Sequence, residues 1–161
     1  MPTCTTMNNT VIDARITLRA NFNIDGCDVH QLLEDVYRAC WDHTALRGLN
    51  LKPQMIAWDA LAVAADREAL VELLDTAIKH VAANTDSGAV HLRAFPTHDE
   101  VYVVFEVKNE LPARRLTDRV EEFTAMMARA RMRVKTMGGE MAEYSTEDGG
   151  SRVCFKLPQW V

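Results

Sequence analysis

The chain has 161 residues, of which 48% are hydrophobic and 25% charged, so it is long enough for one domain with its own core and too short for two. Its formal net charge of −5 argues against nucleic acid or an anionic membrane surface as the main partner, because both attract basic proteins. It contains no run of about 18 apolar residues and no N-terminal secretory pattern, so neither a membrane span nor export is expected.

The four cysteines are scattered and form no pair at a metal-binding or redox spacing. They therefore indicate reduced thiols and a cytoplasmic protein. Cys27, Cys40 and Cys154 are expected to be small buried hydrophobic residues rather than reactive groups.

The first part of the chain predicts a strand and then a helix. Residues 1–11 are polar and are expected to form a flexible segment ahead of a single domain at 12–161. Apolar and polar residues alternate over 12–18, which is typical of a half-buried strand. Asp28 is a typical helix N-cap and Gly48 a typical stop, so a helix is expected between them. Its buried face would contain Val29, Leu32, Leu33, Val36, Cys40 and Leu46.

A second helix is expected after an apolar stretch. Pro53 interrupts the pattern, and residues 55–64 predict a buried strand or an irregular segment. A helix then begins at Asp66 or Arg67 and fades at Asn84. Its apolar positions recur at helical spacing and are Leu70, Leu73, Leu74, Ala77, Ile78 and Val81.

The second half predicts two hairpins with a helix between them. Residues alternate over 89–95 and 101–107, on either side of a turn, and again over 140–145 and 152–158. The helix is expected over 119–137, with four methionines at helical spacing that are mostly core residues. Its inward face would contain Phe123, Met127, Ala130, Val134 and Met137.

The order of these elements predicts a two-layer α/β sandwich. Three helices would cover one face of a mixed, mostly antiparallel sheet. Each helix has a single apolar stripe, and such a stripe is buried most simply against one face of a sheet.

One stretch is specific enough to suggest a family. DREALVELLDTAIKH at 66–80 resembles the N-box helix of the histidine-kinase catalytic domain, the GHKL-type ATP-binding fold also found in gyrase. Segments 22–40, 101–112 and 137–158 are similar to the family's entry helix, its strand into the first glycine box and its closing hairpin, in the family's order. The matching N-box positions are Asp66, Leu70, Leu73, Leu74, Ala77, Lys79 and His80.

The resemblance implies a nucleotide site whose residues have changed. Thr76 stands where the family's asparagine holds magnesium, and Asn109 stands where an aspartate accepts the adenine amino group. The glycines of the first box align with Leu111 and Ala113, and no glycine occurs from 89 to 137. Each lost hydrogen bond to a charged group costs about 1.5–3 kcal/mol, and about 4 kcal/mol in total is a thousandfold in affinity. Weak or no ATP binding is therefore expected, and no cofactor.

The outward face of the same helix contains Glu72, Thr76 and Lys79, which lie at i, i+4 and i+7. It is either a remnant of a nucleotide face, with Glu72 and His80 as catalytic remnants, or a solvated face on which Glu72 and Lys79 form a weak charge pair. A charged His80 would be favoured at this end of the helix by the helix dipole.

Basic residues gather between 114 and 135, although the chain as a whole is acidic. This region is a solvated helix face, a docking surface for an acidic partner, such as a response-regulator receiver domain or a histidine kinase, or a surface that holds a nucleotide phosphate in a rearranged lid. The candidate partner-binding residues are Arg114, Arg115, Arg129 and Arg133.

Three functions are compatible with these patterns. The first is a non-catalytic or weakly nucleotide-binding domain that acts in two-component signalling through protein contact, as a monomer. The second is an ATP-binding catalytic domain, or a fragment of a longer kinase, with magnesium on Thr76 and adenine on Asn109, that phosphorylates a histidine elsewhere. The third is part of a phosphotransfer protein with a four-helix dimer core. Only about 20 residues precede the matched region, which is too few for two long helices, so the third is disfavoured unless the chain is an excised domain. The first function is favoured.

Overall fold

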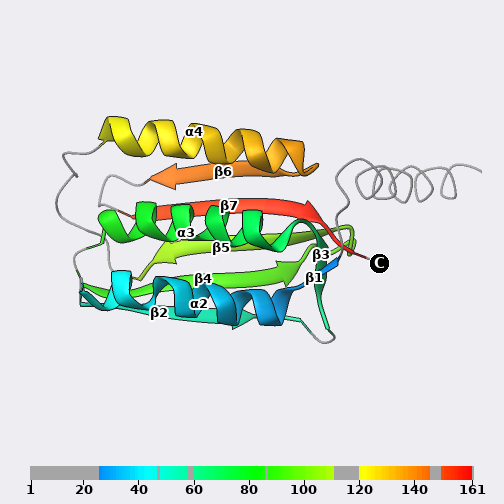
Figure 1. Ribbon diagram of the computed structural model, residues 1–161, viewed down its shortest axis with the longest axis horizontal. Coiled ribbons are helices and arrows are strands. Elements are labelled where there is room, and N and C mark those ends of the chain that lie inside the picture. Colours follow the sequence, from blue (N-terminus) through cyan, green and yellow to red (C-terminus); the bar gives the residue numbers. More distant parts are fainter. Residues whose placement is uncertain are drawn as a thin grey trace, which may run out of the picture.

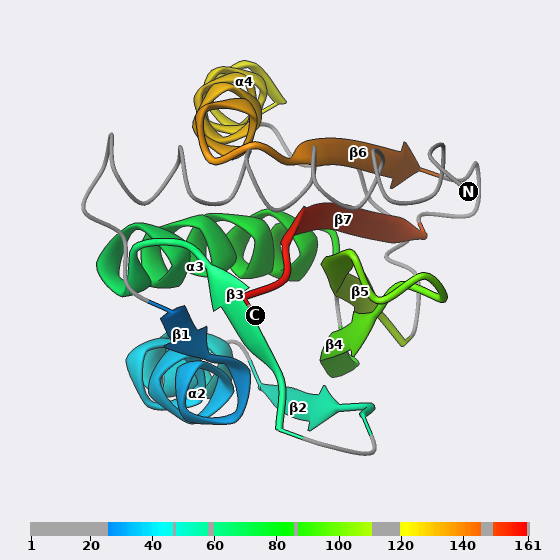
Figure 2. The same cartoon turned by 90° about the vertical axis from the view of Figure 1, so that its right-hand side faces the viewer.

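The computed structural model describes residues 26–46, 48–57, 60–85, 87–110, 120–145 and 150–160. One sheet of five strands carries three helices on a single face (Figures 1 and 2), which confirms the expected sandwich. The helices are α2 (Val29–Leu46), α3 (Arg67–Ala83) and α4 (Val120–Thr136). The strands of the sheet, in spatial order, are β2 (Leu49–Met55), β4 (Gly88–Pro96), β5 (Tyr102–Asn109), β7 (Ser151–Pro158) and β6 (Glu140–Ser145).

The sheet is mixed and mostly antiparallel, as expected. β2 runs parallel to β4, and every other neighbouring pair is antiparallel. Both predicted hairpins are present, β4 with β5 and β6 with β7. Two short strands, β1 (Gly26–Asp28) and β3 (Ala62–Ala64), pair antiparallel beside the main sheet. β3 supplies the strand expected within 55–64, although residues 58 and 59 of that stretch lie outside the described part.

Strand β2 was not predicted, because Pro53 was read as a break. The strand lies at the edge of the sheet, and only one of its sides is paired. Just beyond β2, the amide of Ile56 donates to the Ala94 carbonyl of β4 at 2.8 Å. Since amide directions alternate along a strand, the main chain of Pro53 faces away from β4, where no ladder donor is needed.

The predicted helix boundaries are confirmed by their caps. The Asp28 carboxylate accepts from the His30 amide at 3.0 Å, and the Asp66 carboxylate accepts from the Ala69 amide at 3.2 Å. Asn84 caps the C-terminus of α3. Gly48, beyond the end of α2, has φ +70°, a conformation that favours glycine.

The core lies between the helices and the inner face of the sheet. Alternation along β5 points Val103, Phe105 and Val107 toward the helices, and each is fully buried. The Phe105 and Phe155 rings stack at a centroid distance of 5.2 Å. Every apolar position predicted for α3 is buried, as are the described ones of α2 and α4.

Several predictions fall on residues that the structure does not describe. They are the strand at 12–18, the loop residues Leu111 to Arg119 and the side chains of Leu46 and Phe123. Within the described part of the chain, no helix is both long and apolar enough to cross a bilayer.

Candidate functional site

The residues expected to handle a nucleotide lie on the outward side of α3. Helical periodicity directs the leucines of this helix into the core, so Glu72, Asp75, Thr76 and Lys79 face away from it. Glu72 is exposed, whereas the other three are half-buried. This face is therefore accessible to a ligand in principle, and its chemistry depends on which protein groups its side chains already contact.

Thr76, at the family's magnesium position, hydrogen-bonds within its own helix. Its hydroxyl donates to the main-chain carbonyl of Glu72 at 2.9 Å, the backward bond that threonine commonly makes in helices. The rotamer is therefore fixed by the helix backbone rather than by a ligand.

The carboxylate of Glu72 connects α3 to α4. It lies 2.7 Å from Nη1 of Arg133, so a predicted nucleotide-face residue and a predicted partner-binding residue contact each other. Both side chains are exposed, 66% for Glu72 and 47% for Arg133, so the pair contributes at most about 1 kcal/mol.

Lys79 pairs with Asp75 and not with Glu72. Its Nζ lies 2.8 Å from the Asp75 carboxylate at i−4, and this bond raises the pKa of Lys79. The pair with Glu72, which one of the two alternatives for this face contained, is not formed, because a separation of seven residues is about 10 Å along a helix. The second oxygen of Asp75 accepts from the Cys40 thiol of α2 at 3.2 Å. Lys79 thus belongs to a cluster between α3 and α2.

Asn109 connects three elements at the end of β5. Its amide nitrogen donates to the Asn84 carbonyl at the C-terminus of α3 at 3.3 Å. Its amide oxygen accepts from the Ser151 main-chain N–H at the start of β7 at 3.1 Å. Asn84 lies about 12 Å along the helix axis from Thr76. The carboxamide that the resemblance assigns to adenine therefore joins the sheet to the helix end.

His80 is a half-buried residue of the last turn of α3. Burial lowers the pKa of its imidazole, and the nearby Glu143 carboxylate opposes this only in part. The ring is therefore neutral near pH 7, and the expected benefit from a charged ring at the helix end is not obtained.

The buried thiols behave as expected. Burial raises the pKa of Cys27 to about 11 and that of Cys40 to about 12, so both remain protonated and unreactive near neutral pH. Cys154 is only half-buried, which the sequence did not indicate, and burial raises its pKa as well.

The predicted docking surface is only partly described. Arg129 and Arg133 lie on successive turns of α4 and are exposed, whereas Arg114 and Arg115 lie outside the described residues. The expectation that the methionines are mostly core holds for Met127 and Met137. It is wrong for Met132, which is 70% exposed between the two arginines. An exposed methionine beside cations is typical of an adaptable contact surface.

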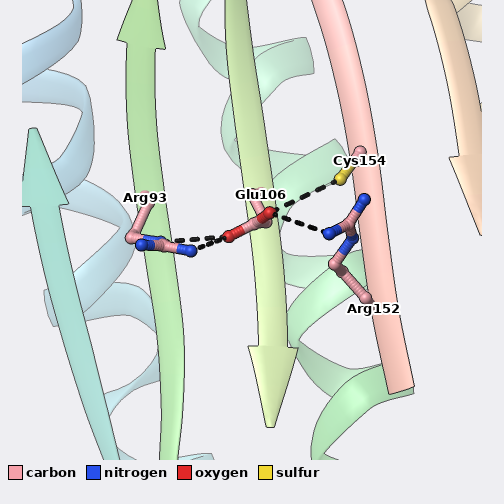
Figure 3. A network of polar contacts seen from close by, with 4 residues as sticks. All are labelled: Arg93, Glu106, Arg152 and Cys154. Atoms are coloured by element: carbon pink, nitrogen blue, oxygen red, sulfur yellow. Dashed lines mark hydrogen bonds and ion pairs between the residues drawn. The ribbon is translucent and has the colours of Figure 1, made fainter. Parts of the chain in front are cut away.

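A polar network on the opposite face of the sheet was missed (Figure 3). Glu106 of β5 is only 6% exposed and accepts on one oxygen from Nε and Nη2 of Arg93, at 3.0 and 2.5 Å. Its other oxygen lies 3.5 Å from Nη1 of Arg152 and accepts from the Cys154 thiol at 4.0 Å. The signal was present in the sequence, since a glutamate interrupts an apolar strand and the hairpin register places it opposite Arg93.

No protein-family model and no curated protein matches the chain. Solved structures do match. The catalytic domain of histidine kinase ThkA has a TM-score of 0.67 at 16% identity, covering 84% of this chain and 96% of that one. The chain has the fold of a histidine-kinase catalytic domain.

Two larger assemblies contain the same fold. Full-length ShkA in complex with AMPPNP gives a TM-score of 0.67 at 18% identity, covering 84% of this chain and 31% of that one. ThkA in complex with the response regulator TrrA gives a TM-score of 0.65 at 15% identity, covering 95% of this chain and 48% of that one. The resemblance seen at residues 66–80 is thus confirmed for the fold of this kinase-like domain, whereas ligands and partners are properties of those proteins.

Proposed function

We propose that this kinase-like domain binds nucleotide weakly or not at all and acts in two-component-type signalling through protein contact. One observation carries the proposal: the polar groups at the expected nucleotide positions are engaged within the protein. Thr76 bonds to its own helix, Lys79 is held by Asp75, and both ends of the Asn109 carboxamide have partners.

A nucleotide would have to replace these contacts before gaining its own. If Asn109 bound adenine, its carboxamide would lose its hydrogen bonds to α3 and β7. Each such bond contributes about 0.5–1.5 kcal/mol to the stability of the fold. Binding phosphate through Lys79 would separate it from a carboxylate 2.8 Å away. The residues present therefore do not fit ATP and magnesium well, and no catalytic step is assigned to them.

The exposed side of α4 supports the protein-contact part of the proposal. Arg129, Met132 and Arg133 form a basic surface around an apolar side chain, which suits an acidic partner. ThkA has been solved with a response regulator, so a response regulator or a histidine kinase is the partner class we propose. In this proposal the domain works in the cytoplasm as a monomer.

Isothermal titration with AMPPNP and magnesium tests the proposal. No saturable heat is expected up to millimolar nucleotide, for the wild type and for Thr76→Asn alike. A dissociation constant for AMPPNP in the micromolar range for the wild type would overturn the proposal. Micromolar binding by Thr76→Asn alone would show that one side chain, rather than the whole face, limits affinity.

A second candidate is an ATP-binding catalytic domain that phosphorylates a histidine on another domain or protein. The observation in its favour is that ShkA, which has the same fold, was solved with AMPPNP. In this case Lys79 would leave Asp75 to bind phosphate, and Lys79→Ala would abolish phosphotransfer. Activity unchanged by Lys79→Ala would remove this candidate.

A further inference from the structure

The outer face of the sheet, opposite the helices, carries one row of basic side chains. The strand registers place Lys52 of β2 beside His91 of β4, His91 beside Lys108 of β5, and Lys108 beside Arg152 of β7. Tyr144 of β6 ends the row beside Arg152. Side chains alternate between faces, and Val107 and Val153, which adjoin Lys108 and Arg152, are buried in the core. All five residues of the row therefore point away from the helices. We call them the basic row.

The basic row is only partly neutralised by the protein itself. Glu110 lies 3.2 Å from His91 and 3.7 Å from Lys52, and Glu106 contacts Arg152 from the neighbouring register position. Lys108 has no ion pair with any residue of the described ranges and sits between His91 and Arg152. Like charges side by side on a sheet oppose folding, so this arrangement does not serve stability.

Arg152 is already held in a fixed position. Its guanidinium lies 3.5 Å from the Glu106 carboxylate and 4.5 Å from the centre of the Tyr144 ring. The side chain remains 45% exposed. An anionic group that binds there would therefore meet an oriented guanidinium and cost little extra side-chain entropy.

We infer that the basic row binds the acidic face of an α-helix from a partner protein. Adjacent strands lie about 4.8 Å apart, so the four basic residues of the row, from Lys52 to Arg152, extend over about 14 Å. Successive turns of an α-helix rise about 5.4 Å, so four carboxylates on successive turns extend over about 16 Å. The mismatch of about 2 Å is within the reach of flexible lysine and glutamate side chains. Alternate residues of an extended peptide lie about 6.7 Å apart and match the strand spacing less well.

The surrounding charge favours a protein helix over a nucleic acid. The chain as a whole carries −5, so a long polyanion would be repelled beyond the row, whereas a short acidic helix face would contact mainly the row itself. The row points away from the face that the helices cover, because the neighbouring residues Val107 and Val153 are buried in the core. The inference therefore does not depend on whether α3 binds a nucleotide or α4 binds a partner.

Fluorescence anisotropy with a labelled helical peptide tests the inference. The probe is an alanine-rich peptide of about 15 residues with glutamates at i, i+4, i+7 and i+11, and its control has the same composition with the glutamates spread around the helix. The patterned peptide is expected to bind at least about tenfold more tightly than the control, and more weakly as salt is raised.

Two matched variants locate the binding surface. Lys108→Glu reverses one charge in the row and is expected to weaken binding at least about tenfold. It places a carboxylate between His91 and Arg152, which favours the fold, so loss of binding would not reflect unfolding. Lys135→Glu makes the same charge change on exposed α4 and should alter binding by no more than about twofold.

Four results would overturn the inference. They are no binding of the patterned peptide up to millimolar concentration, equal binding of the two peptides, equal loss from the two variants, and tighter binding of a single-stranded RNA of the same charge. The last result would assign the row to nucleic acid instead.

Discussion

Asn109→Asp separates a structural role of this residue from a ligand-binding one. The change installs the carboxylate that the resemblance places here and keeps nearly the same shape. The new side chain still accepts from the Ser151 N–H, but it cannot donate to the Asn84 carbonyl. Instead a carboxylate oxygen faces that carbonyl oxygen at about the 3.3 Å that the hydrogen bond now has. Losing this hydrogen bond and leaving two acceptors face to face should lower the free energy of unfolding by about 1–3 kcal/mol.

Urea denaturation followed by circular dichroism measures this cost. For a domain of this size each kcal/mol lowers the melting temperature by about 2–4 °C, so a thermal melt provides a second measure. Asn50→Asp is the matched control, because Asn50 is exposed on edge strand β2, and it should change stability by less than about 0.5 kcal/mol. Equal stabilities of the two variants would refute the structural role of Asn109. Micromolar ATP binding gained by Asn109→Asp would refute the proposal that the site no longer suits a nucleotide.

Two further predictions concern packing and pH. Gly139→Ala would place a Cβ 2.1 Å from the Lys156 carbonyl oxygen and should lower the free energy of unfolding by nearly 3 kcal/mol, the upper end of about 1–3 kcal/mol. Gly48→Ala has open space around its Cβ but a φ of +70°, so it should lower the free energy of unfolding by only about 1 kcal/mol. Denaturation midpoints compare the two variants, and a smaller loss at Gly139 would contradict the packing of α4 on β7. The Cys40 thiol keeps its proton to about pH 12 in the folded state but loses it from about pH 9 in the unfolded chain, so the free energy of unfolding should fall as pH rises through this range, by up to about 1.4 kcal/mol per pH unit. Cys40→Ala should flatten that slope in denaturant titrations from pH 8 to 11, and an unchanged slope would show that the thiol is not the responsible group.

The architecture was predictable where each segment carries its own signal. The apolar stripe of α3 and the N-caps Asp28 and Asp66 depend only on residues a few positions apart. The hairpins likewise depend on alternation on either side of a short turn. Strand β2 was missed because Pro53 is unfavourable inside a sheet, and its tolerance there follows only from the edge position, which depends on how distant strands assemble.

The candidate site was predictable in position but not in its contacts. Spacing alone placed Glu72, Thr76 and Lys79 on one face of α3, where the structure has them. It did not reveal that Arg133, 61 residues away in sequence, pairs with Glu72. The partner of Lys79 could have been predicted, because Asp75 lies at the favoured i−4 spacing, but only a weak pair with Glu72 was considered, as one alternative. Which charged side chains pair depends on their distance in the folded protein, and the spacing within a single helix does not give the distance to residues of other elements.

The separation of the two faces of α3 allows the fold to persist whether or not the polar face binds a nucleotide. The matched apolar residues, such as Leu70 and Leu74, are fully buried, and shortening one of them to alanine would cost about 2–5 kcal/mol. Thr76 lies on the polar face, where most substitutions change stability by less than about 0.5 kcal/mol. The residues that specify the helix and those that would bind a nucleotide are therefore different residues under different physical constraints. A protein can keep the apolar contacts that define the fold while the side chains of its polar face form hydrogen bonds and ion pairs within the protein. Similarity of fold is therefore no measure of ATP affinity.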